Sequence, residues 1–139
     1  MKYSLLFSDS PDESLRQAII DPLIAYNVSK AGPSDHCVLS ISLQDVDKNC
    51  VGGLYGRTDY GWLFIELVFV PESMRGQGIG RRLIKMAETE AIVRQCHGVW
   101  LDTFEFQARN FYEKCGYQVF AELPDFPIGT SRYFMKKNI

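Results

Sequence analysis

The chain has 139 residues, of which 46% are hydrophobic, and this predicts a protein with a continuous apolar core. Fifteen lysines and arginines against seventeen aspartates and glutamates give a net charge of −2, which excludes a protein that coats nucleic acid through overall positive charge. The balanced composition, with 13% aromatic residues, also excludes an intrinsically disordered chain. We therefore expect a single domain over residues 1–139 and no nucleic-acid partner.

The first predicted elements are two helices separated by a proline. Ser10 can cap the start of the first helix, with Glu13 three residues later as in a capping box. The Asp-Pro pair at 21–22 predicts the end of that helix and the start of a second one. The Ala-Gly-Pro-Ser-Asp segment at 31–35 then predicts a loop.

The rest of the chain predicts strands interleaved with two more helices. The apolar run Trp62–Val70 is typical of a strand that is buried on both faces of a sheet. The expected strands cover residues 37–43, 50–55, 62–70, 99–103, 117–123 and 131–135, and the expected helices cover residues 78–94 and 107–114. A hairpin, a β-α-β crossover and a closing hairpin give an α/β pattern with mixed strand directions, an α+β arrangement.

The most informative segment, residues 70–82, lies between the buried strand and the long helix and reads VPESMRGQGIGRR. Glycines at alternate positions remove side chains from the turn, so that several backbone N–H groups can converge on an anion. The positive end of the helix dipole and the neighbouring arginines add attraction for negative charge. The segment predicts a phosphate or pyrophosphate site.

Other phosphate-binding turns match this segment less well. No Gly-Lys-Ser/Thr sequence ends the turn, which excludes a Walker A loop. A dinucleotide-binding turn is disfavoured because Gly76 comes five residues after Pro71, and because Arg81 takes the place of the third glycine. Glycines that only shape a tight strand–helix connection would explain one or two of the three.

Two segments carry a resemblance to a known family. Arg75-x-x-Gly78-x-Gly80 and, downstream, Ala108–Tyr117 (ARNFYEKCGY) resemble the acetyl-CoA signatures of the GNAT superfamily of N-acetyltransferases. The resemblance implies a GNAT-like fold, with a central mixed sheet of about six or seven strands flanked by about four helices. It also implies an enzyme that moves the acetyl group of acetyl-CoA to a primary amine by direct attack within a ternary complex.

The resemblance implies that acetyl-CoA is the co-substrate, without a metal, and that backbone atoms bind most of it. The pyrophosphate would lie on N–H groups of the glycine-rich turn, and the pantetheine arm would pair with the end of the preceding strand, where an N–H would hold the acetyl carbonyl. The implied cofactor-binding residues are Phe69, Val70, Arg75, Gly76, Gln77, Gly78, Ile79, Gly80 and Arg81.

Tyr112 and Glu66 are the candidate catalytic residues. Tyr112 matches the tyrosine that gives or shares a proton with the departing thiolate in the family, although an aromatic residue on a short helix can also serve packing alone. Glu66 is the charged residue of the apolar strand and is expected on the same face as Val68 and Val70. It could take the amine proton, directly or through water, or hold a cationic substrate, or it could pair with an arginine or backbone donors.

Asp102 and Glu105 compete with Glu66 as substrate-binding carboxylates, because both follow the strand at 99–103. Glu105 also departs from the family, which often has asparagine seven residues before the tyrosine. This departure indicates either a lost contact to the cofactor arm or a gained contact to substrate.

The implied acceptor is a small-molecule or peptide amine. The slight acidity of the chain favours a cationic acceptor, such as a polyamine, an aminoglycoside-like antibiotic, or a protein lysine or N-terminus. Dimers are frequent in the family, so a homodimer stays an open alternative. A second hypothesis is a non-catalytic CoA-binding sensor or interaction module of the same fold, which would have no need of the acid Tyr112.

The expected cellular location and metal content rest on three features that the sequence does not show: a membrane span, a secretory signal and a CxxC pair. The apolar run Trp62–Val70 is interrupted by Glu66 and falls far below the about 20 residues that a membrane-spanning helix needs. The N-terminal apolar stretch is too short for a secretory signal. The four cysteines are scattered without a CxxC pair, which favours reduced thiols. We expect a cytoplasmic protein without a membrane or metal partner.

Overall fold

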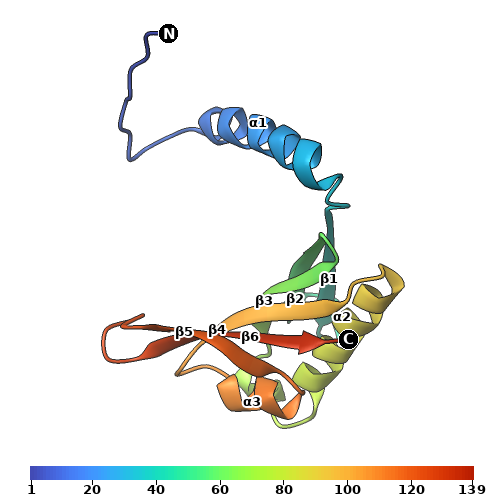
Figure 1. Cartoon of the computed structure of the whole chain (residues 1–139). Coiled ribbons are helices and arrows are strands. Elements are labelled where there is room, and N and C mark those ends of the chain that lie inside the picture. The colour runs from blue at the N-terminus through green and yellow to red at the C-terminus, as the bar shows by residue number, and fades with distance from the viewer. The chain divides into compact units, whose positions relative to one another are not determined.

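The computed structural model describes all 139 residues, which form two compact units, Met1–Ser34 and Asp35–Ile139 (Figure 1). The first unit holds one helix, and the second holds a six-stranded sheet with two further helices. That residues 1–139 act as one domain stays a prediction.

The helix of the first unit, α1 (Glu13–Ala31), is continuous, so the prediction of two helices was wrong. Pro22 lies inside it, where its φ near −65° is compatible with a helix although its ring removes one N–H donor. The expected cap was also wrong. Asp12, rather than Ser10, caps the helix, and its Oδ1 accepts a hydrogen bond from the Leu15 N–H at 3.2 Å.

The second unit is built on a mixed sheet with the strand order β1-β2-β3-β4-β6-β5. Its strands are β1 (Cys37–Gln44), β2 (Cys50–Asp59), β3 (Trp62–Phe69), β4 (Gly98–Phe104), β5 (Gln118–Pro124) and β6 (Ser131–Asn138). Only β3 and β4 pair in parallel, and all other neighbours are antiparallel. The predicted α+β class with a mixed sheet is confirmed, with three α-helices in place of about four.

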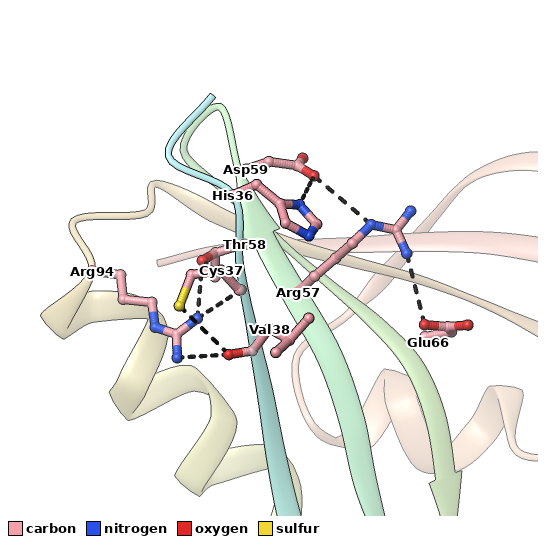
Figure 2. A network of polar contacts seen from close by, with 8 residues as sticks. All are labelled: His36, Cys37, Val38, Arg57, Thr58, Asp59, Glu66 and Arg94. Atoms are coloured by element: carbon pink, nitrogen blue, oxygen red, sulfur yellow. Dashed lines mark hydrogen bonds and ion pairs between the residues drawn. The ribbon is translucent and has the colours of Figure 1, made fainter. Parts of the chain in front are cut away.

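Helix α2 (Ile79–Val93) packs on β1 to β4 and forms the core with them (Figure 1). Its buried residues Leu83, Ile84, Ala87 and Ala91 recur at helical spacing, as the amphipathic pattern predicts. Arg94 ties the end of this helix to β1, because its guanidinium donates to the carbonyl oxygens of Cys37 at 2.9 Å and Val38 at 3.2 Å (Figure 2).

A partly buried polar cluster links α2 to the end of the chain. The Tyr117 hydroxyl donates to Glu88 Oε2 at 2.9 Å, and Lys137 Nζ lies 3.0 Å from the same carboxylate. Glu88 therefore joins α2 to β6 and to the segment between α3 (Arg109–Lys114) and β5.

The sheet opens between β3 and β4. Their pairing ends at Ile65↔Leu101, although β3 continues to Phe69 and β4 to Phe104. The prediction that this strand is buried on both faces was therefore wrong beyond Ile65, since Leu67 is 62% and Phe69 is 56% exposed. The unpaired edge of β3 leaves backbone groups free to bind an extended ligand.

A β-bulge lies in β3 at the same place. Tyr55 and Gly56 of β2 are consecutive, but they face Leu67 and Ile65, so Glu66 is the extra residue on β3. Such an extra residue changes which face the following side chains point to.

Candidate active site

The glycine-rich turn connects β3 to α2 through a 3₁₀ turn at Glu72–Met74. Gly76 and Gly78 have φ angles of 76° and 77°, a left-handed conformation that other residues adopt only with strain. Gly80 serves a different purpose, since a Cβ there would lie 3.1 Å from the ring of Phe111. Two glycines thus shape the turn, and the third lets α2 begin close against α3.

The start of α2 presents free backbone donors. The N–H groups of Gly76–Arg81 have no acceptor within the chain, and the N–H of Arg82 is the first to bond back, to the Gly78 oxygen at 3.1 Å. Unpaired amides at the positive end of a helix fit the charge and size of a phosphate group. The turn therefore fits a phosphate or pyrophosphate group.

Arg75 holds the turn against the strand. Its backbone N–H donates to the Glu72 oxygen at 3.2 Å, and its side-chain Nε donates to the Val70 oxygen at 2.9 Å. Its guanidinium also lies 5.9 Å from the centre of the Phe69 ring. The expected contact of a phosphate with the Arg75 N–H would compete with the hydrogen bond from this N–H to the Glu72 oxygen. The guanidinium of Arg75 is therefore the group better able to bind an anion.

A cavity of about 830 Å³ extends from this turn along the unpaired part of β3 to α3. The predicted site residues that line it are Glu66, Phe69, Val70, Arg75, Gly76, Gly78, Ile79, Gly80, Arg81, Asp102 and Tyr112. Gln77 and Glu105 are not among its lining residues. The fold thus brings both sequence motifs and two of the three candidate carboxylates to one cavity.

Tyr112 lies on α3 with its side chain 7% exposed. Burial raises the pKa of its hydroxyl to about 12, and nearby Cys115 and Asp102 contribute in the same direction. The hydroxyl has no hydrogen-bond partner in the chain. Every fully buried side-chain oxygen and nitrogen has a partner, so the Tyr112 oxygen is not fully buried and is open to the cavity that Tyr112 lines. Tyr112 is therefore a protonated donor at neutral pH.

Glu66 faces Arg57 across the edge of the cavity (Figure 2). Its Oε2 lies 3.7 Å from Arg57 Nη1, and the Glu66 side chain is 45% exposed. Arg57 Nε in turn lies 3.8 Å from Asp59 Oδ2, and the Arg57 guanidinium lies 4.7 Å from the centre of the Phe64 ring. The pairing of Glu66 with an arginine is thus present, but it is loose and open to water.

The expected facing of Glu66 was wrong. Val68 and Val70 pack against the buried core, whereas the Glu66 carboxylate points to Arg57, whose guanidinium lies over Phe64. The bulge causes the difference, because one extra residue breaks the alternation of side chains along the strand.

Asp102 is paired more tightly than Glu66. It accepts a hydrogen bond from Arg132 Nε at 2.9 Å and makes a second, closer contact with Arg132 Nη2. The Arg132 guanidinium lies 4.9 Å from the ring centres of both Phe104 and Phe126. Asp102 therefore contributes a carboxylate that is already neutralised.

Glu105 has a local partner. Its Oε2 accepts a hydrogen bond from the Ser131 N–H at 3.1 Å, and its own N–H donates to the Ser131 oxygen at 2.9 Å. The carboxylate thus fastens the loop after β4 to the start of β6, and it lies outside the cavity lining.

Sequence reasoning missed several lining residues at the end of β4 and just after it. Thr103, Phe106 and Gln107 line the cavity, and Phe106 is 66% exposed. Their place after the carboxyl end of a parallel strand was the available signal, because ligands bind in the crevice at such ends. An arginine was expected as one possible partner of Glu66 but was not identified as Arg57, because a hairpin residue becomes a neighbour of Glu66 only through strand pairing.

The described residues contain no group of three His, Cys, Asp or Glu side chains placed to hold a metal ion. All four cysteines are free thiols. No helix combines the length and the apolar character that crossing a bilayer would require.

Comparisons with known proteins agree on one family. The model of the acetyltransferase (GNAT) family matches residues 4–117. A relative in Agrobacterium fabrum, the acetyltransferase Atu2258, is 41% identical over 134 residues, which cover 96% of this chain and 98% of the relative. The blasticidin-S acetyltransferase of Streptomyces morookaense is 38% identical over 89 residues, 63% of this chain and 65% of that protein.

Solved structures show the same fold. A candidate acetyltransferase from Agrobacterium tumefaciens is 40% identical and has a TM-score of 0.94, covering 99% of this chain and 100% of its own. An aminoglycoside 6'-N-acetyltransferase, solved in complex with coenzyme A, shares the fold at 21% identity with a TM-score of 0.63, covering 73% of this chain and 72% of its own.

Proposed function

The chain belongs to the GNAT acetyltransferase family and is an acetyltransferase, and on that premise we propose that it acetylates the primary amine of a small cationic molecule with acetyl-CoA. The observation that carries the proposal is a single cavity that joins the free amides at the start of α2, the open edge of β3 and the protonated Tyr112. Acetyl-CoA, when bound, supplies the thioester whose acetyl group is transferred.

The chain holds this co-substrate through its backbone. The N–H groups of Gly76–Arg81 receive the pyrophosphate, and the guanidinium of Arg75 adds positive charge beside them. The unpaired edge of β3 up to Phe69, with the N–H of Val70 just beyond it, hydrogen-bonds the extended arm and directs an N–H at the acetyl oxygen, on which negative charge grows. The opening of the sheet thus aligns the reacting groups.

The reaction needs no nucleophile from the protein. The neutral amine nitrogen forms a bond to the acetyl carbon, the carbon–sulfur bond breaks, and its electron pair leaves on sulfur. The nitrogen loses one proton as it becomes the amide, and the sulfur gains one proton and ends as the thiol. Tyr112 donates a hydrogen bond to the departing sulfur. Glu66 attracts the ammonium form of the acceptor and accepts its proton, directly or through one water, because its pairing with Arg57 at 3.7 Å is loose.

A cationic small molecule is the proposed acceptor class. The cavity end next to Glu66 and Asp102 offers carboxylates, of which Glu66 is the less tightly paired. The relatives that act on blasticidin S and on aminoglycosides support a small-molecule amine over a peptide. Blasticidin S, an aminoglycoside and a polyamine therefore form the first panel of acceptors.

The experiment compares wild type with Gly78→Glu and Gly129→Glu. Gly78 and Gly129 have similar φ angles, 77° and 85°, and open space around the Cβ position, but Gly129 does not line the cavity. We expect micromolar binding of acetyl-CoA by calorimetry in wild type and Gly129→Glu, loss of binding in Gly78→Glu, and thiol release with at least one amine. Absence of binding by wild type at millimolar acetyl-CoA would overturn the proposal.

A further inference from the structure

We propose that the ring of Phe106 is a stacking platform for the acceptor, and that the preferred acceptors are primary amines joined to a flat unsaturated ring. This inference rests on the proposed function, because it names the acceptor class of the same cavity. Phe106 is 66% exposed and lines the cavity that also contains Glu66 and Tyr112. A large apolar ring left open to water inside a ligand cavity gains free energy when a ligand covers it.

The platform is built from aromatic rings on one side. The Phe106 ring stacks on Phe104 with centres 5.0 Å apart and planes 10° apart. Phe104 stacks in turn on Phe126 at 5.5 Å, and Arg132 lies 4.9 Å from both of these rings. One face of Phe106 is therefore supported by a row of rings, and the opposite face is available to a ligand.

The neighbours of Phe106 hold its loop in place. Glu105 is bonded to Ser131 through both its N–H and its carboxylate. On the other side, Gln107 Oε1 accepts the Phe104 N–H at 2.9 Å and lies 3.3 Å from Thr103 Oγ1. Because the polar residues on both sides of Phe106 are used to fix the loop, the ring is presented in a defined position before a ligand arrives.

Charge and shape together define the acceptor. Glu66 and Asp102 line the same cavity, and Glu66, which is less tightly paired than Asp102, attracts the amine in its ammonium form. A flat ring can stack on the open face of Phe106, whereas a puckered saturated ring of the same size cannot match that geometry. The two requirements describe an amine carried on a short linker from an aromatic or other unsaturated ring.

The test uses two matched amines, 2-phenylethylamine and 2-cyclohexylethylamine. Both are cationic at neutral pH, and the saturated ring is the more hydrophobic, so apolar burial alone would favour it. We expect wild type to prefer the phenyl compound in kcat/KM by about three- to tenfold, as stacking geometry allows. Phe106→Leu should remove the preference and Phe106→Trp should keep it, with KM for acetyl-CoA unchanged in both variants.

Phe120→Leu is the matched control, since Phe120 is an exposed ring on β5, 51% accessible, that does not line the cavity. It should keep the wild-type preference. An equal preference in wild type and Phe106→Leu would overturn the inference, as would a raised KM for acetyl-CoA in Phe106→Leu, because the ring would then contact the co-substrate.

The failure of this inference can be told from failure of the proposed function. If other primary amines are acetylated and neither matched amine is, the proposed function stands and the inference is wrong. If no amine releases thiol, the proposed function fails. Calorimetric titration of the two amines into the protein saturated with coenzyme A then compares them without turnover, and equal affinities would overturn the inference.

Discussion

Tyrosine is protonated at neutral pH, and burial makes the Tyr112 hydroxyl a still weaker acid by raising its pKa to about 12. A thiol ionises near pH 8.5, so full transfer of the phenol proton to a thiolate is unfavourable by roughly three pKa units. In the proposed reaction the hydroxyl would therefore act mainly by hydrogen bonding to sulfur while negative charge develops there. This places its contribution in the transition state rather than in binding of the substrates.

Replacing Tyr112 with phenylalanine removes that hydrogen bond and keeps the packing of the ring. We expect kcat to fall on the order of 10²-fold, while the affinity for acetyl-CoA stays close to that of wild type. Thiol-release kinetics and calorimetry measure the two quantities. An unchanged kcat would assign Tyr112 to packing alone, which is the alternative that the sequence left open.

Glu66 is proposed to accept the proton of the amine. The pH dependence of kcat/KM distinguishes this role from simple attraction of a cation. A primary amine has a pKa near 10.4, so the neutral form is scarce at pH 7 and its fraction rises about tenfold per pH unit. If Glu66 accepts the amine proton, the Glu66→Gln variant can use only amine that is already neutral. Its kcat/KM should therefore rise steeply from pH 7 to 9 towards the wild-type value.

Wild type measured with the same amine is the reference for this profile. A deficit in Glu66→Gln that stays constant over the pH range, and that lies in the acceptor KM, would mean that Glu66 only holds the cation.

At the scale of elements, the features that could be predicted from the sequence are those that the spacing of apolar side chains determines. The long helix was expected at 78–94 and is observed as Ile79–Val93, because its apolar positions recur at helical spacing and glycine marks its start. The glycine-rich turn was predicted as an anion site for the same kind of reason, since its local sequence determines its conformation.

The bulge in β3 could not be predicted in this way. Whether Glu66 is an extra residue depends on how Ile65 and Leu67 pair with β2, and the apolar run looks continuous whichever register is formed. The error in the facing of Glu66 and the omission of Arg57 share this cause. The exposed position of Phe106 was missed likewise, because it depends on contacts of its neighbours with β6.

At the scale of the whole molecule, charge is separated along the cavity despite the small net charge of −2. Arg75 and Arg81 lie at the end with the free amides, where an anion is expected, and the loosely paired Glu66 lies at the other, beside Asp102, which Arg132 already neutralises. Such a distribution favours simultaneous binding of an anionic co-substrate and a cationic acceptor, which a ternary-complex reaction requires. Net charge alone does not reveal it.

The buried tyrosines also affect the stability of the folded chain at alkaline pH. The unfolded chain loses a tyrosine proton near pH 10, whereas folded Tyr112 keeps its proton to about pH 12. This contribution to the free energy of unfolding is therefore complete below pH 10 and is lost as the pH rises through 10 towards 12. Burial and Glu88 raise the pKa of Tyr117 as well, which adds a loss in the same direction.

Tyr112→Phe isolates the part that belongs to Tyr112, because phenylalanine cannot ionise and the hydroxyl has no partner in the chain to lose. Urea unfolding between pH 9 and 11 should show that wild type loses about 1 kcal/mol more than Tyr112→Phe. Tyr3→Phe, at a residue that is 83% exposed, should follow the wild-type curve. Parallel curves for wild type and Tyr112→Phe would contradict a raised pKa of the Tyr112 hydroxyl.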